Sequence, residues 1–266
     1  EQFVGYPWML REWRLWRRWW RMYQKLPQPL RQALYVIVKP FFQQRGAYRA
    51  LDYVRRSAAN DPLYWGGGVD LMPVYLELLL TRQWAELTQL PRRYAQKLHD
   101  RAAAALPDPT LLQQMVWYEF QHRLPELLLM RVDKITMAHS VEARVPFLDY
   151  RLVEFTLNLP DHLRLPDGKT PKLLLKRAAE RILPGDIIYR PKQGFAAPVD
   201  VWMRTVWHDY AKQTILDSYF VRNGIISRFA VQHLFYLLKH KQQRLGKSIY
   251  ALLNLALWHR RFFGDC

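Results

Sequence analysis

The sequence of 266 residues has one cysteine, Cys266, at its last position. No disulfide bond can therefore form within the chain, and neither a thiol nucleophile nor a cysteine-based metal site is expected. No apolar run approaches the roughly 18 uninterrupted residues that would predict a membrane-spanning helix, and no signal peptide is evident. We therefore expect a cytoplasmic protein. Because the chain begins at Glu1 rather than Met, we expect either processing or a piece of a longer protein.

Acidic residues are scarce. The 40 Lys and Arg residues outnumber 23 Asp and Glu residues, which gives a net charge of +17. Such a charge favours polyanionic partners such as nucleic acid, an anionic membrane surface or nucleotide phosphates. The chain lacks the aromatic strand signatures of RNA-binding domains and any defensible helix-turn-helix spacing, so no specific nucleic-acid partner is expected.

Strand-like alternation is nearly absent, and no βαβ rhythm is found. Helical periodicity instead runs through five stretches, so we predict a mainly α fold. Breaks are expected at Pro91, Pro107 and Pro109, and a turn at Asn223-Gly224. Gly66-Gly67-Gly68 is not followed by Lys-Ser/Thr and is interpreted as a flexible turn rather than a phosphate-binding loop. The five helical stretches are Leu71–Arg82, Tyr94–Ala104, Leu111–Met137, Ile226–His240 and Ile249–Phe263.

A Trp- and Arg-rich stretch from Trp8 to Leu26 is strongly amphipathic. One helical face carries Met9, Trp13, Trp16, Trp20 and Tyr23, and the opposite face carries Arg11, Arg14, Arg18, Arg21 and Lys25. Pro27 and Pro29 are expected to end this helix. One hypothesis is a basic helix for an anionic membrane. The favoured one is an aromatic face packed on the rest of the protein, with the basic face in solvent.

Two clusters of charged residues are candidates for a functional site. In the first, between Arg131 and Asp149, six ionisable groups lie beside apolar neighbours that we expect to be buried. Glu142, Arg144 and Asp149 are therefore expected to form a local ion-pair network. Arg131 and Lys134 have donors suited to a phosphate or carboxylate.

The second cluster is the loop Tyr189-Arg190-Pro191-Lys192-Gln193-Gly194-Phe195. Its two cations stand on a chain constrained by Pro and Gly, an arrangement that suits stabilisation of charge on a transferring phosphate. A solvated basic turn is the alternative interpretation.

These motifs together resemble the asparagine synthase family. The run R-V-D-K-I-T-M-A-H-S-V-E-A-R-V-P-F-L-D, from Arg131 to Asp149, is similar to the family pattern R/K-x-D-x-x-S-M-x-x-S-x-E-x-R-x-P-F-L-D, with Thr136 in place of the usual Ser. Gly168-Lys169, Lys172 and the loop ending at Phe195 follow the family order. The final Leu-Trp-His-Arg-Arg-Phe-Phe resembles its C-terminal helix. Glu1 to Tyr6 resembles the end of S-G-x-G-x-D-E-x-F-x-G-Y.

The resemblance implies an ATP-dependent ligase of asparagine biosynthesis. In this family a carboxylate, such as aspartate, is adenylated with ATP and Mg²⁺ and then attacked by ammonia. The ammonia comes from glutamine, through an N-terminal glutaminase domain. The implied fold is the helical C-terminal part of an α/β adenine-nucleotide-hydrolase-like (PP-loop) synthetase domain. Since no Ser-Gly-Gly-x-Asp-Ser loop, catalytic N-terminal Cys or sheet pattern occurs here, we expect the chain alone to be inactive.

Site residues follow by position from the resemblance. Lys192, Glu1 and Arg131 are implied as catalytic, and Tyr6, Lys192 and Arg190 as nucleotide-binding, with no metal ligand in the chain. Asp133, Glu142, Arg144 and Asp149 are implied as a structural network. Residues 1–106 form a divergent helical segment and residues 107–266 a motif-bearing one. The acceptor that is amidated stays open, and a homodimer is one expected assembly. The alternatives to an enzyme are a basic anion-binding module and a helical scaffold.

Overall fold

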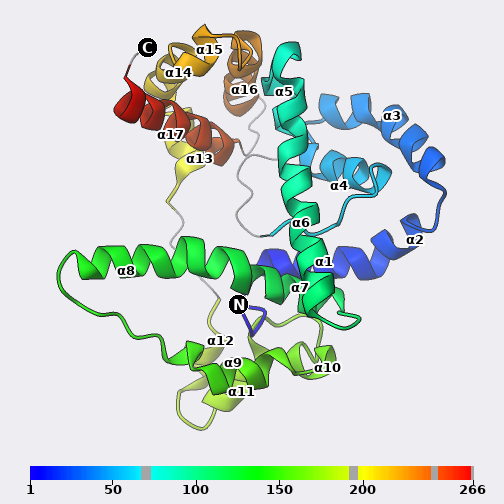
Figure 1. Ribbon diagram of the computed structural model, residues 1–266, viewed down its shortest axis with the longest axis vertical. Helices are drawn as coiled ribbons and strands as arrows, with labels where there is room; N and C mark the ends of the chain where they lie inside the picture. The colour runs from blue at the N-terminus through cyan, green and yellow to red at the C-terminus, as the bar shows by residue number, and fades with distance from the viewer. Residues whose placement is uncertain (67–72, 192–196, 241–244, 265–266) are drawn as a thin grey trace. The chain divides into compact units, whose positions relative to one another are not determined.

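The computed structural model describes residues 1–66, 73–191, 197–240 and 245–264 (Figure 1). Within these ranges the chain forms α-, 3-10 and π-helices and no strand, and a single antiparallel bridge joins Leu80 to Ile226. The prediction of a mainly α fold is confirmed. No helix of the described ranges is both long and apolar enough to cross a membrane.

The chain divides into two compact units, each assembled from three stretches of sequence. The first unit comprises Glu1–Pro27, Asp61–Gly68 and Ala95–Lys192, and the second comprises Gln28–Asn60, Val69–Tyr94 and Gln193–Cys266. Both units therefore contain residues from either side of position 106. The predicted division at that position concerned motif content and stays a prediction.

The helices of the first unit are α1 (Pro7–Leu15), η1 (Trp16–Trp20), α2 (Arg21–Tyr23), α7 (Leu111–Tyr118), η3 (Glu119–Leu129), α8 (Met130–Met137), η4 (Pro146–Leu148), α9 (Tyr150–Leu157), α10 (Asp161–Arg164), α11 (Leu173–Ala179) and α12 (Gly185–Tyr189). Those of the second unit are α3 (Gln28–Gln44), α4 (Tyr48–Ala58), α5 (Pro73–Leu79), η2 (Arg82–Gln89), α13 (Val199–Arg204), α14 (His208–Leu216), α15 (Tyr219–Arg222), α16 (Arg228–His240) and α17 (Gly246–Phe263). Helix α6 (Leu90–Ala105) belongs to both units.

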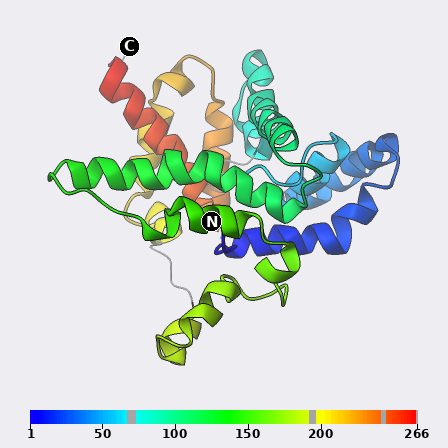
Figure 2. The same cartoon turned by 60° about the horizontal axis from the view of Figure 1, so that its bottom comes forward.

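The predicted helix over Leu111–Met137 is confirmed as the continuous run of α7, η3 and α8, the green rod in Figures 1 and 2. Thr110 begins this run with a capping box. The Thr110 hydroxyl accepts a hydrogen bond from the Gln113 backbone amide, and the Gln113 side chain accepts one from the Thr110 backbone amide. Pro125 lies in its middle, where proline lacks a donor and would clash with the preceding turn. The wider π-helical turns of η3 accommodate this residue.

Helical structure also covers Pro7–Tyr23, as expected for the Trp- and Arg-rich stretch. The prediction that Pro27 and Pro29 end this helix was wrong about the position of the helix end. The helix ends at Tyr23, and Pro29 lies in the first turn of α3, where a missing amide costs nothing. Pro91 likewise lies in the first turn of α6.

The burial of this stretch agrees with the favoured hypothesis for it. Met9 and Trp20 are buried, while the other residues of the aromatic face are half-buried. The Trp13 ring packs over Gly168, where an added Cβ would lie 3.2 Å from the ring. The five cations of the basic face are all exposed.

The core of the second unit lies among α13, α14, α16 and α17. Met203, Ile215, Val231, Leu238 and Ile249 are almost completely buried there. Burial of each such aliphatic side chain contributes about 1.5–3 kcal/mol. The Asp200 carboxylate fixes the start of α17 by accepting from the Gly246 amide at 2.7 Å.

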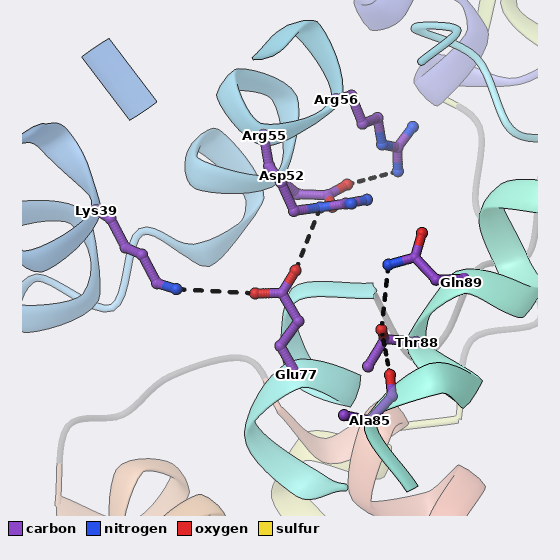
Figure 3. A network of polar contacts seen from close by, with 8 residues as sticks. All are labelled: Lys39, Asp52, Arg55, Arg56, Glu77, Ala85, Thr88 and Gln89. Carbon is purple, nitrogen blue, oxygen red and sulfur yellow. Dashed lines mark hydrogen bonds and ion pairs between the residues drawn. The ribbon is translucent and has the colours of Figure 1, made fainter. Parts of the chain in front are cut away.

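A polar network joins α3, α4 and α5 in the same unit (Figure 3). Asp52 is buried, and its carboxylate pairs with Arg56 at 2.6 Å and with Arg55 at 3.4 Å. The Glu77 carboxylate forms two longer ion pairs: its Oε1 lies 4.0 Å from Arg55 Nε, and its Oε2 lies 3.9 Å from Lys39 Nζ. Such pairs offset the cost of burying Asp52, so we interpret the network as structural.

Candidate functional site

Glu1 and Tyr6 meet a cation from the middle of the chain. The Tyr6 hydroxyl donates to Glu1 Oε1 at 2.7 Å, and Arg123 Nη1 lies 3.6 Å from the same oxygen. The Arg123 guanidinium also lies 4.4 Å from the centroid of the Tyr6 ring. In both ribbon views the N-terminus lies beside the long helix that carries Arg123 (Figures 1 and 2).

A buried carboxylate anchors this cation. Glu119 is fully buried one turn before Arg123 in η3, and its Oε2 lies 3.4 Å from Arg123 Nη1. The Tyr64 hydroxyl donates to Glu119 Oε1 at 2.7 Å. Arg123 is therefore shared between one buried carboxylate and the carboxylate of Glu1. This sharing sets the position of the Glu1 side chain.

The ionisation of the cluster follows from these contacts. Burial raises the pKa of Tyr6, and its hydrogen bond to Glu1 raises it further, while Arg123 opposes the rise. Burial alone would lower the pKa of Arg123, but hydrogen bonding with Tyr6 and the charges of Glu119 and Glu1 raise it overall. Tyr6 is therefore kept neutral and Arg123 charged.

Stacked rings form one wall of the cluster. Tyr6 stacks on Trp8, Trp8 on Tyr64 and Tyr64 on Tyr118, with centroid separations of 5.2, 5.8 and 5.6 Å. His99 closes the stack edge-on against Tyr118 and donates from Nε2 to the Tyr64 carbonyl oxygen at 3.3 Å. Burial lowers the pKa of His99, although this hydrogen bond favours its protonated form. The wall holds Tyr6 in one orientation.

The segment from Glu1 to Tyr6 is also fixed by the motif-bearing part of the chain. The Lys172 amide donates to the Phe3 carbonyl oxygen at 3.1 Å, and Gln2 Nε2 donates to the Phe147 carbonyl oxygen at 2.7 Å. The Lys172 side chain crosses Gly5 so closely that an added Cβ would lie 2.5 Å from its Cε. Because Cε lies near the end of a flexible side chain, a larger residue at position 5 would displace the Lys172 side chain from its present course.

Arg131 and Asp133 do not join this cluster. Both are exposed on α8. The expectation of buried apolar neighbours was wrong here, because Val132, Ile135, Met137, Val141 and Phe147 are all among the exposed large side chains. No packed layer of the described chain covers this stretch, so its charges stay in contact with solvent.

The predicted network of Glu142, Arg144 and Asp149 forms only in part. Arg144 Nη2 donates to Glu142 Oε2 at 3.0 Å, with the two side chains 80% and 66% exposed. Asp149 instead pairs with Arg151 at 2.8 Å and caps α9 by accepting from the Arg151 amide. These hydrogen bonds lower the pKa of Asp149. The helix cap directs the Asp149 carboxylate toward its own helix, so Asp149 pairs with Arg151 rather than with Arg144.

The second cluster is described only up to Pro191. Arg190 is exposed at the end of α12, and the Tyr189 hydroxyl donates to Glu180. Lys192, Gln193, Gly194 and Phe195 lie outside the described residues. The roles predicted for Lys192 and Arg190 therefore stay predictions.

Sequence reasoning missed Arg123, Glu119 and Tyr64. One indication was present, since Glu119 is the only acidic residue between Asp108 and Glu126 and Arg123 follows it at i+4 spacing. Nothing in the local pattern connects this pair with Glu1 or Tyr64, which reach it only through the fold.

The chain contributes few donors for the cofactors implied by the resemblance. Among the described residues no group of three or more His, Cys, Asp or Glu side chains could hold a metal ion. These residues do not fit a Mg²⁺ site, so no step is assigned through that ion. For nucleotide phosphates the exposed Arg131 and Arg190 are suitable cations.

Comparison with known proteins gives consistent matches. The family model for asparagine synthase matches residues 1–260. A putative glutamine-hydrolysing asparagine synthetase of Mycobacterium tuberculosis (strain ATCC 25618 / H37Rv) is 28% identical over 254 residues, which cover 91% of this chain and 36% of that protein. Glutamine-hydrolysing asparagine synthetases of Gallus gallus and Bacillus subtilis (strain 168) are 30% and 31% identical. Those matches cover 65% and 50% of this chain and 27% and 20% of the relatives.

The chain thus spans between about a fifth and just over a third of the length of these relatives. No solved structure matches it significantly.

Proposed function

The chain belongs to the asparagine synthase family, and we propose on this premise that it forms part of a cytoplasmic, ATP-dependent amide-forming enzyme. In this proposal the complete enzyme adenylates the carboxylate of aspartate or an analogue. Ammonia released from glutamine by a glutaminase domain then displaces AMP. The pyrophosphate-binding loop and the glutaminase domain come from parts of the enzyme that this sequence does not contain.

One observation carries the proposal beyond family membership. Glu1 and Tyr6, for which the resemblance implies a position at the nucleotide and substrate cleft, meet in one hydrogen-bonded cluster with Arg123. An oriented carboxylate, a neutral phenol and a fixed cation suit the positioning of a polar substrate. Glu1 presents its carboxylate toward the substrate, and Tyr6 and Arg123 hold it in place.

The remaining roles concern charge. Lys192 stabilises negative charge that develops on the transferring phosphate, and Arg131 and Arg190 attract the nucleotide or the carboxylate. ATP would supply the activation of the carboxylate when bound to the complete enzyme. Glu142, Arg144 and Asp149 shape the connection between α8 and α9.

The test is Lys192→Ala in the complete enzyme. Loss of one cation that stabilises a transition state lowers the rate by roughly a hundredfold to a thousandfold. We expect amide formation to fall by at least about a hundredfold, while the circular dichroism spectrum stays unchanged. The matched control is Lys97→Ala on an exposed position of α6, which should keep full activity. Near-normal turnover of a folded Lys192→Ala enzyme would remove the role assigned to Lys192.

A further inference from the structure

The proposed function does not explain a stretch of the second unit that lacks acidic residues. Between Asp217 and Asp265 the sequence has no Asp or Glu, whereas eight Lys and Arg residues lie there. Helices α15, α16 and α17 form most of the described part of this stretch. An excess of positive charge of this kind favours an anionic partner. The exposed side chains of α17 indicate which anionic partner fits.

Helix α17, drawn in red in Figure 1, has one face in the core of the second unit and another that exposes apolar side chains. Ile249 and Leu252 belong to the core. On the outer face, Leu255, Trp258 and Phe262 follow one another at spacings of three and four residues, so they form a stripe along the helix. Their exposed fractions are 38%, 50% and 70%. An apolar stripe of this kind on a surface helix indicates a contact site.

The last turns of α17 carry an aromatic cluster, defined as Trp258, Phe262 and Phe263. The centroid of the Trp258 ring lies 6.0 Å from that of Phe262 and 5.3 Å from that of Phe263, which is 59% exposed. His259 stacks on Phe263 at 5.3 Å and on Tyr219 of α15 at 4.4 Å. Ring contacts within the second unit therefore hold the cluster in place although its side chains are exposed.

Basic side chains flank the aromatic cluster. Arg260 and Arg261 are exposed in the same turns of α17, and Lys247 is exposed in its first turn. The sequences of α15 and α17 contain no acidic residue. A helix that combines Trp, Phe and Leu with Arg and Lys in this way is typical of those that lie at the boundary between lipid headgroups and acyl chains.

The chemistry of this face favours a bilayer over other anionic or apolar partners. Single-stranded nucleic acid stacks its bases on open ring faces, but these rings pack on one another at interplanar angles of 45° and 63°, and Leu255 would stay in water. A second copy of the chain would bring the same cations together without acidic residues in the stretch to pair with them. An anionic bilayer offers phosphates to the arginines and an interfacial layer to the rings.

We propose that the aromatic cluster of α17, together with Arg260 and Arg261, is a docking surface for an anionic lipid bilayer. The attachment is peripheral and weakens with salt, because it combines interfacial burial of the rings with pairing of the arginines to phosphates. None of these residues belongs to the candidate site, so the attachment would hold whichever carboxylate the enzyme amidates.

The experiment is sedimentation of the full chain with lipid vesicles at about 0.1 M salt, where the Debye length is about 10 Å. Vesicles of phosphatidylcholine alone are compared with vesicles containing about one third phosphatidylglycerol. We expect binding to the anionic vesicles only. At about 1 M salt, where the Debye length is about 3 Å, this binding should weaken at least about tenfold.

The first variant removes the cations. Each cation near an anionic surface changes the binding constant about fivefold, so Arg260→Gln/Arg261→Gln is expected to weaken binding to the anionic vesicles about 25-fold. The matched control is Arg93→Gln/Lys97→Gln, which removes two exposed cations from α6 and should leave the binding constant unchanged.

The second variant removes an exposed ring. Phe262→Gln is expected to weaken binding roughly tenfold, since most of this side chain is in water before binding and enters the interfacial layer on binding. The matched control is Phe155→Gln on α9, whose side chain is 62% exposed, and it should bind like the unmodified chain.

Three results of the sedimentation would overturn the proposal. One is equal binding to neutral and anionic vesicles. Another is binding that neither α17 variant weakens, which assigns the membrane contact to a different part of the chain, such as the basic stretch Pro7–Tyr23. The third is binding by the 266-residue chain but not by the complete enzyme, which assigns the face to a contact with the rest of the enzyme.

A second measurement needs no substitution and decides the question if a variant unfolds. The only cysteine, Cys266, follows Phe263 by three residues and can carry a polarity-sensitive fluorophore. We expect its emission to move to shorter wavelength with anionic vesicles and to stay unchanged with neutral ones. An emission spectrum that anionic vesicles leave unchanged would also overturn the proposal.

Discussion

At the scale of single residues, Glu119 is the most constrained side chain of the candidate site. It is 0% exposed, and its carboxylate contacts Arg123 and Tyr64. A buried carboxylate that loses its cation keeps the full cost of desolvation. The stability of the first unit and the position of Glu1 therefore depend on the same arginine.

Arg123→Met is expected to lower the free energy of unfolding by about 3 kcal/mol, because it removes the cation that lies beside the buried carboxylate of Glu119. The measurement is urea unfolding followed by circular dichroism. Adding Glu119→Gln to this variant should recover part of the loss, since a neutral amide needs no counter-ion. The control Arg144→Met removes the ion pair with Glu142, whose two side chains are 80% and 66% exposed. The free energy of unfolding should therefore not change measurably. An unchanged midpoint for Arg123→Met would contradict this account.

At the scale of secondary-structure elements, α13 and the start of α17 approach each other closely in the second unit. A Cβ added to Gly246 would lie 2.5 Å from Asp200 Cα and 2.7 Å from its backbone nitrogen. The neighbouring atoms are backbone and cannot rotate away. Position 246 therefore requires glycine for packing rather than for its backbone angles.

Gly246→Ala is expected to destabilise the second unit by about 2 kcal/mol through this overpacking. The first residue of α12, Gly185, has no heavy atom within 4 Å of an added Cβ, so Gly185→Ala provides the matched control. The control should be neutral or slightly stabilising because alanine favours helix. Thermal unfolding of both variants tests the difference, and equal midpoints would refute the close contact.

At the scale of the whole molecule, the proposed function implies that this chain contributes only part of an active site. We expect the 266-residue chain alone to release no pyrophosphate from ATP in the presence of aspartate and ammonia. The physical reason is that phosphate transfer needs a preorganised loop around the phosphates, and the sequence has no Ser-Gly-Gly-x-Asp-Ser run. A coupled pyrophosphate assay measures this. Release that Lys192→Ala abolishes would contradict the prediction.

The sequence by itself determined the helical class and the family. Helical periodicity is local, so Leu111–Met137 and the Trp- and Arg-rich helix followed from the spacing of apolar residues. Motif order along the chain is equally independent of the fold and identified the asparagine synthase family. Helix boundaries at Pro29 and Pro91 were less accurate, because a proline fits the first turn of a helix as well as the position after its end.

Only the tertiary structure decided which charged groups meet. Glu1, Tyr64 and Arg123 come from three separate stretches of the first unit, and no periodicity relates them. The same holds for Asp149, whose partner was set by the cap of α9, and for the exposure of the residues around Arg131. Hydrophobic spacing specifies which face of an element is buried, but a side chain's partner depends on the neighbouring element against which that face packs.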